Sequence, residues 1–98
     1  MRSSRPAGTR RFDRERLPPV LDYHARHGLR LLGRGPWRSA ICPFHDDHEP
    51  SLRVHVKSGA FRCMACDARG GDVLDFHMRR TGKSFVASAI ELGAWSWT

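Results

Sequence analysis

The 98-residue chain carries 17 Lys and Arg against 10 Asp and Glu, for a net charge of +7, and 40% of its residues are hydrophobic. This length suits one small domain and excludes a doubly wound or barrel enzyme with a large pocket. The apolar runs are too short for a transmembrane helix, and the basic N-terminus lacks the apolar segment of a secretory signal. Because so small a core is marginal, we expect a disulfide set or a metal to stabilise it.

The positive charge is concentrated in the first part of the chain. Residues 1–16 carry six arginines against two acids, residues 17–41 carry four against one, and residues 42–98 are neutral overall. A basic arm is either a solvated tail or a contact for a polyanion. We predict a disordered basic arm over residues 1–16, a folded domain over 17–93 and a short tail over 94–98.

The predicted elements begin with a helix over 18–27, opened by two prolines and ended by Gly28. Short strands are predicted over 29–32 and 37–41, on either side of a Gly-Arg-Gly-Pro turn. Residues 51–56 alternate between apolar and polar side chains, which predicts a half-buried strand, and 60–63 returns as its partner. Residues 69–71 are expected to be a flexible lead into a helix.

Two helices are predicted near the C-terminus. Asp72 is a good N-cap for the first helix, which Gly82 ends. Ser84 caps the second helix, which Gly93 ends. The chain is therefore of α+β class, with strands in its middle and helices on both sides.

Two ligand pairs, each with two intervening residues, carry the clearest chemical signal. Cys42 and His45 form the first pair and Cys63 and Cys66 the second, with 17 residues between the pairs. Such spacing points both side chains of a tight turn at one metal, and a strand, turn and strand can bring the pairs together. Three thiolates and one imidazole are a closed, tetrahedral zinc set. We predict one structural Zn²⁺ and no hydrolytic chemistry at the metal.

Two alternatives to this assignment remain open. The cysteines could be plain buried thiols, although their odd number argues against a closed disulfide framework. His48 could replace His45 as the ligand, although the two-residue spacing favours His45. Free thiolates indicate a reducing compartment, so a cytoplasmic location is expected.

The sequence around the ligand pairs resembles the zinc-binding domain of bacterial DnaG-type DNA primases, the CHC2-type zinc finger. The resemblance covers about residues 17–93. It is carried by Cys-Pro-Phe-His at 42–45, Pro-Ser at 50–51, Cys-Met-Ala-Cys at 63–66 and Gly-Asp at 71–72. It implies a small zinc ribbon, with an antiparallel sheet of about four to five short strands and flanking helices. The zinc ligands that it implies are Cys42, His45, Cys63 and Cys66.

The resemblance also implies a role in DNA replication, because the family's domain helps primases to recognise single-stranded template for primer synthesis. In primases a larger polymerising domain follows, whereas this sequence stops at Thr98. We therefore expect no priming by the chain alone. The implied partners are single-stranded DNA and a separate primase catalytic subunit or replicative helicase, with no membrane and no small-molecule substrate.

Basic residues on and around the central hairpin form the candidate nucleic-acid surface. An exposed basic sheet face can track phosphates, and nearby rings can stack on bases. The alternative is an ordinary solvated face. Trp37 is the nearest ring, and we expect it to lie in the core. The candidate contacts are Arg53, His55, Lys57, Arg62, Arg34 and Arg38.

A protein-interaction adaptor is the competing functional class. In this hypothesis the zinc is purely structural, and the basic arm and the C-terminal tryptophans hold a partner protein. Trp95 and Trp97 alternate with small residues. They either cap the core or form a docking tail, and the sequence does not decide between the two.

Overall fold

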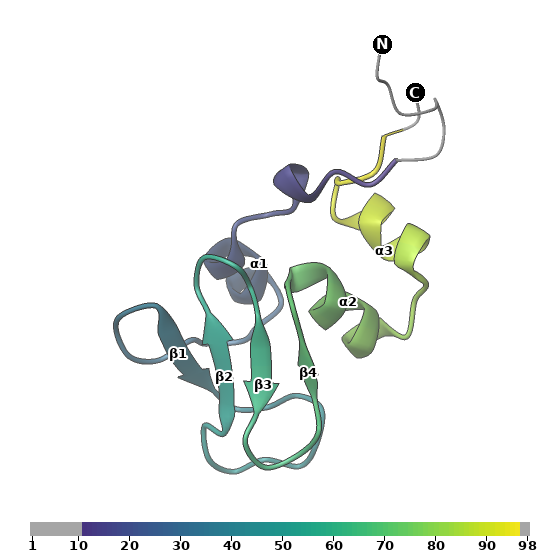
Figure 1. Ribbon diagram of the computed structural model, residues 1–98. Helices are drawn as coiled ribbons and strands as arrows, with labels where there is room; N and C mark the ends of the chain where they lie inside the picture. Colours follow the sequence, from purple (N-terminus) through teal and green to yellow (C-terminus); the bar gives the residue numbers. More distant parts are fainter. Residues whose placement is uncertain (1–10, 97–98) are drawn as a thin grey trace.

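The computed structural model describes residues 11–96, so the predicted arm up to residue 10 and the residues Trp97 and Thr98 lie outside the described part. A short 3-10 helix is followed by one helix, four strands and two more helices (Figure 1). In chain order these are the 3-10 helix Arg14–Arg16, α1 Val20–Arg26, β1 Trp37–Ala40, β2 Leu52–His55, β3 Phe61–Cys63, β4 Arg69–Gly70, α2 Val73–Thr81 and α3 Phe85–Glu91. No helix within residues 11–96 has the length and apolar character that a membrane span requires.

The four strands form one antiparallel sheet in the order β1-β2-β3-β4, which confirms the predicted zinc-ribbon architecture of short strands with flanking helices. Its register aligns one residue from each strand in a row across the sheet. The row consists of Ser39, Arg53, Arg62 and Arg69. Neighbours in such a row lie on the same face of the sheet.

One face of the sheet is covered by helices and the other is open. The predicted alternation of β2 is confirmed, because Leu52 and Val54 are fully buried and Arg53 is exposed. Phe61 of β3 and Phe76 of α2 meet edge to face, with their ring centroids 4.9 Å apart. In Figure 1 α1 lies behind the sheet, so that view looks onto the open face.

Three predictions about local structure were wrong. Residues 29–32 form no strand, only a bridge between Leu32 and Ser39. Residues 69–71 are not simply a flexible lead, because β4 pairs with β3 there. Trp37 is not in the core: its exposed fraction is 43%. The reason is that Trp37 begins an edge strand and pairs with His55, so its side chain alternates onto the open face with His55 and Arg53.

The predicted helix caps are confirmed at α2 and α3. The Asp72 carboxylate accepts the N–H of Asp75 at 2.9 Å, and the Ser84 hydroxyl accepts the N–H of Ala87 at 3.1 Å. Gly82 follows α2 in the left-handed conformation, with φ of +75°. These local signals explain why the boundaries of both helices were predictable.

A partly buried hydrogen-bond chain joins α1, α2 and α3. The Tyr23 hydroxyl lies 2.7 Å from Nδ1 of His77, and Nε2 of His77 donates to Glu91 at 2.5 Å. Burial raises the pKa of Tyr23 to about 12, so the hydroxyl keeps its proton. Residues 11–16 are also attached, since Asp13 N–H donates to the Ala94 carbonyl and Arg14 pairs with Asp72. The proposed domain boundaries at 16/17 and 93/94 stay predictions.

Candidate metal centre and nucleic-acid interface

The four predicted ligands converge at one end of the sheet. The ligand atoms of Cys42, His45, Cys63 and Cys66 all lie within 4.8 Å of one another. Cys42 follows β1 by two residues, Cys63 ends β3, and Cys66 lies in the turn before β4. The hairpin therefore carries the second ligand pair to the first.

The spacing within the cluster matches a tetrahedral zinc ion. Zinc–sulfur bonds of about 2.3 Å in tetrahedral geometry place two sulfurs about 3.8 Å apart. The Sγ atoms of Cys42 and Cys66 lie 3.9 Å apart, and Nδ1 of His45 lies 3.9 Å from Sγ of Cys63. The residues thus fit one zinc, held by three thiolates and Nδ1 of His45. His48 is not part of the cluster; its exposed ring lies 3.7 Å from Asp46.

Backbone donors surround the sulfurs. The N–H groups of Ala65 and Cys66 point at Sγ of Cys63 at 3.3 and 3.4 Å, and the oxygen of the Ser51 hydroxyl, whose proton is donated to Asp47, lies 3.5 Å from the same sulfur. Burial raises the pKa of the Cys63 thiol, but these hydrogen bonds outweigh it and lower the pKa to about 7. Burial raises the pKa of the Cys42 thiol to about 12 in the protein without metal. A bound zinc ion overrides that cost, because it deprotonates a coordinating thiol outright.

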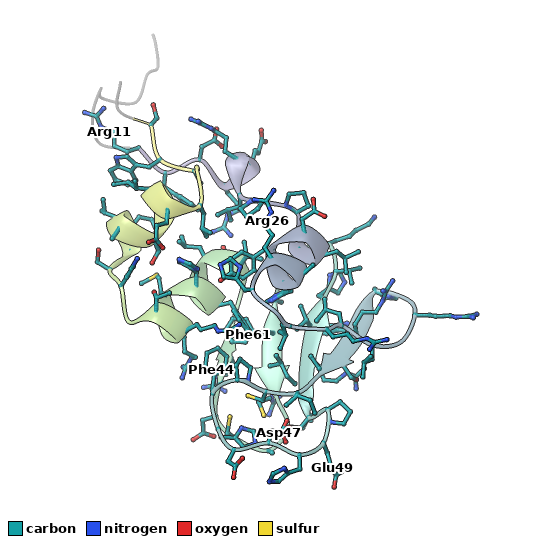
Figure 2. All side chains as sticks on the ribbon, turned by 180° about the vertical axis from the view of Figure 1, so that it is seen from behind. Arg11, Arg26, Phe44, Asp47, Glu49 and Phe61 are labelled. Atoms are coloured by element: carbon teal, nitrogen blue, oxygen red, sulfur yellow. The ribbon has the colours of Figure 1, made fainter. Side chains whose placement is uncertain are left out.

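Asp47 organises the first ligand turn, a role that the sequence pattern does not indicate. Its Oδ2 accepts the N–H of Cys42 and the hydroxyl of Ser51, each at 2.8 Å, and its Oδ1 lies 3.5 Å from Nε2 of His45. The hydrogen bond from Cys42, with help from Ser51, lowers the pKa of Asp47 to about 2. Figure 2 shows Asp47 beside the sulfur atoms.

An aromatic trio connects the metal centre to the core. The ring of Phe44, between the first two ligands, lies 5.0 Å from that of Phe76 and 6.1 Å from that of Phe61 (Figure 2). Offset and edge-to-face contacts of this kind add to the burial of the rings. Metal binding and core packing are therefore coupled through Phe44.

The open face of the sheet carries three arginines in one row. Arg53, Arg62 and Arg69 come from β2, β3 and β4, and all three side chains are exposed. Within residues 11–96, none of them forms an ion pair. Arg69 was missed in the sequence because β4 was not predicted. Their positive charges are thus concentrated and not neutralised.

The other candidate contacts lie around this row. His55 meets the ring of Trp37 edge to face at 5.0 Å, on the open face beside Arg53. Lys57 is exposed in the turn after β2, and Arg34 is exposed in the turn before β1. Arg38 sits opposite Val54, on the face away from Arg53, and its Nε donates to the Gly35 carbonyl at 3.0 Å. The row and the Trp37–His55 pair are therefore adjacent, and Arg38 points elsewhere.

The four antiparallel strands with a Cys₃His centre place this chain in the class of zinc-ribbon domains. Comparison with known protein families identifies the family within that class. The model of the CHC2 zinc finger family matches residues 25–96. The chain belongs to the CHC2 zinc finger family.

The relatives found by sequence and by structure are DNA primases. The DNA primase of Mycoplasma genitalium is 32% identical over 68 residues, which are 67% of this chain and 11% of that protein. The DNA primase of Streptomyces coelicolor is 41% identical over 63 residues, 64% of this chain and 9% of that protein. A crystal structure of the Aquifex aeolicus primase, comprising its zinc-binding and RNA polymerase domains, matches 82% of this chain and 19% of its own, with a TM-score of 0.67 and 29% identity. The chain thus spans about a tenth of the length of the curated relatives that it matches.

Proposed function

We propose that this chain is a single-stranded-DNA-binding module that recognises template in primer synthesis and works with a separate catalytic subunit or helicase. The observation that carries the proposal is the row of Arg53, Arg62 and Arg69 on the open face of the sheet. A row of unpaired cations can follow a phosphate backbone without reading its sequence. The zinc holds the strands that carry this row in register.

The Trp37–His55 pair supplies the second element of such a surface. Single-strand binders combine a basic track with rings on which bases stack, and each stacked base contributes about 1–3 kcal/mol. Trp37 is 43% exposed and belongs to the same face as Arg53. Bases of a strand that crosses the arginine row could therefore reach this ring. Duplex DNA offers no unstacked bases, so the pair favours single strands.

The proposal is tested by fluorescence anisotropy with zinc-loaded protein and labelled single- and double-stranded oligonucleotides at several salt concentrations. We expect tighter binding to single strands and a log–log salt slope of about −0.7 for each phosphate contact. Absence of salt-dependent binding to single strands would refute the proposal.

Paired variants locate the contact surface. Arg53→Ala with Arg62→Ala is expected to reduce the salt slope by about 1.4, because two phosphate contacts are lost. Arg26→Ala with Arg30→Ala removes the same charge. Arg26 lies on α1, on the side of the sheet that is opposite the open face and that is turned toward the viewer in Figure 2. That control is expected to leave the slope close to the wild-type value. Equal losses in the two variants would mean that only net charge matters.

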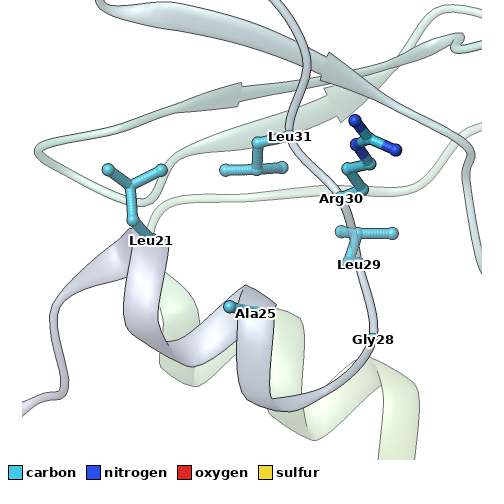
Figure 3. Close-up of a pocket in the computed structure, with 6 residues that line it drawn as sticks. All are labelled: Leu21, Ala25, Gly28, Leu29, Arg30 and Leu31. Carbon is cyan, nitrogen blue, oxygen red and sulfur yellow. The ribbon is translucent and has the colours of Figure 1, made fainter.

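The accessory role requires a surface for a partner protein, and an apolar groove beside α1 is suited to it. The groove, of about 490 Å³, is lined by Leu21, Ala25, Gly28, Leu29, Arg30 and Leu31 (Figure 3). Leu21 is 46% exposed, so the groove keeps an open apolar side. Arg30 adds positive charge to the lining. These features fit an amphipathic helix with leucines on one face and acids on its flank.

A pair of designed helical peptides tests this docking mode. Both carry the same leucine face, and the flanks carry glutamates in one and lysines in the other. We expect the acidic peptide to bind and Leu21→Ser to weaken its binding, with single-stranded DNA affinity unchanged. Equal affinity for the two peptides, or no effect of Leu21→Ser, would remove the groove from the proposal.

A further inference from the structure

Arg69 borders two separate hollows on the surface. The first, of about 210 Å³, is formed by the turn from Arg62 to Arg69 that holds the second ligand pair. The second, of about 490 Å³, lies between β4 and the second half of α2. Its lining comprises Arg69, Asp75, Met78, Arg79, Gly82 and Lys83. Because β4 is the edge of the sheet, Arg69 stands where the open face ends and the helical side begins.

We propose that the bound single strand continues past the sheet, turns over the β4 edge at Arg69 and enters the hollow beside α2, where Arg79 contacts its phosphates. This inference rests on the proposed function, since it extends the same nucleic-acid site. It adds a second segment to the path and assigns Arg79 a role that the row on the sheet does not include.

The charges that line the hollow favour a phosphate backbone. Arg69 and Arg79 form no ion pair within residues 11–96, whereas Lys83 is paired with Glu91. Asp75 is the one acid in the lining, and its Oδ2 already accepts the N–H of Gly71 at 2.8 Å. The lining thus holds two guanidinium groups without an ion pair and one carboxylate that already accepts a backbone N–H. Arginine is well suited to phosphate oxygens because its donors form a planar fork.

A ring contact orients the Arg79 side chain. Its guanidinium lies over the ring of Phe44, 5.8 Å from the ring centroid. A cation–π contact leaves the edge of the guanidinium free to donate. Met78, the neighbouring residue in the lining, is half-buried and offers an apolar surface to a sugar or base. The hollow therefore combines a positioned cation with an apolar wall.

The arginine row is short, so the length of an oligonucleotide decides whether it can also reach the hollow beside α2. Neighbouring strands of a sheet are about 4.8 Å apart, so the row from Arg53 to Arg69 spans about 10 Å. A very short oligonucleotide can occupy the row alone. A longer one would also reach the hollow beside α2. Substitutions at Arg79 should therefore affect long oligonucleotides and spare short ones.

The experiment measures affinities of zinc-loaded full-length protein for oligo-dT of 4, 8, 12 and 16 nucleotides. Arg79→Gln is compared with Arg80→Gln, a neighbour that is exposed but does not line the hollow. We expect Arg79→Gln to weaken binding of the 16-mer about tenfold and to leave the 4-mer unchanged. Arg80→Gln should change neither. Zinc content and circular dichroism verify that both variants keep the fold.

Two results would overturn the inference, and both are distinct from failure of the proposed function. Equal effects of Arg79→Gln and Arg80→Gln on the 16-mer, or an effect of Arg79→Gln that is the same at every length, would show that the strand does not enter the hollow. In either case Arg53→Ala with Arg62→Ala would still weaken binding. If that sheet variant binds all lengths as the wild type does, the proposed function itself fails.

Discussion

Asp47 and His45 form a carboxylate–imidazole pair behind the metal centre. Oδ1 of Asp47 lies 3.5 Å from Nε2 of His45, the ring nitrogen that faces away from the cysteines, and Nδ1 faces Cys63. A carboxylate beside this nitrogen favours the tautomer that carries its proton on Nε2 and leaves Nδ1 free for the metal. The same carboxylate holds the Cys42 N–H, so one side chain orients both members of the first ligand pair.

Asp47→Asn should therefore lower zinc affinity by about 10- to 100-fold, the usual effect of losing such a partner. Asp46→Asn is the matched control, because the Asp46 side chain is 93% exposed and lies 3.7 Å from the exposed ring of His48. Competition with a chromophoric chelator gives both affinities. If the two variants bind zinc equally well, Asp47 has no role in orienting the ligands.

Zinc removal is expected to unfold the domain. Structural zinc contributes on the order of 10 kcal/mol in small metal-binding domains, and here the site joins the only sheet among the described residues. Addition of a strong chelator under reducing conditions should abolish the near-ultraviolet circular dichroism of the tryptophans, and zinc should restore it. A signal that persists in metal-free protein would contradict this expectation.

His45 and His48 provide a test of the ligand assignment. His45→Ala should reduce zinc stoichiometry or affinity sharply, because the imidazole is the fourth ligand of the cluster. His48→Ala should have little effect, since that side chain is 84% exposed and outside the cluster. Elemental analysis after dialysis measures both. Loss of zinc from His48→Ala alone would reverse the assignment.

The sequence allowed the metal centre to be predicted because its signal is local. The two-residue spacing within each ligand pair and the alternation of β2 depend on neighbouring residues, and both led to the observed positions. The caps at Asp72 and Ser84 are local in the same sense. The structure bears out these features.

The features that could not be predicted depend on pairing between distant segments. β4 has only two residues and exists because Arg69 and Gly70 pair with β3. Without β4, the third arginine of the row had no assigned face. Trp37 is large and apolar, which favours burial, yet the pairing of β1 with β2 places it on the open face. Local composition does not encode which face an edge strand presents.

Gly70 and Gly71 should respond differently to alanine. A Cβ on Gly70 would lie 2.6 Å from a ring carbon of Phe61 and 2.7 Å from Cβ of Asp75, whereas one on Gly71 would meet only Asp75 Oδ2 at 3.6 Å. Neither glycine has a positive φ, so the difference is one of space. Gly70→Ala is expected to lose about 1–3 kcal/mol of unfolding free energy, as overpacked cores do. Gly71→Ala should lose much less unfolding free energy in the same denaturant titration. Equal losses in the two variants would mean that β3 and β4 separate easily and so relieve the close contact at Gly70.

His24 should make the domain less stable in mild acid. Its side chain is fully buried, the Phe76 ring lies 4.5 Å away edge to face, and within residues 11–96 neither ring nitrogen has a hydrogen-bond partner. Burial, with smaller contributions from His27 and Arg80, lowers the pKa of His24 to about 4. The unfolded chain therefore binds a proton that the folded chain rejects, between the unfolded pKa of about 6.5 and the folded value.

The contribution of His24 to stability is thus complete above about pH 6.5 and is lost as the pH falls toward 4. Between pH 7 and pH 5 this loss amounts to about 2 kcal/mol. Acid also protonates the zinc ligands, so the test compares the wild type with His24→Leu in excess zinc at both pH values. We expect the variant to lose about 2 kcal/mol less than the wild type over this interval, because leucine has no proton to gain. Identical losses in the two proteins would show that His24 does not titrate during unfolding and that the acid sensitivity arises at the metal centre.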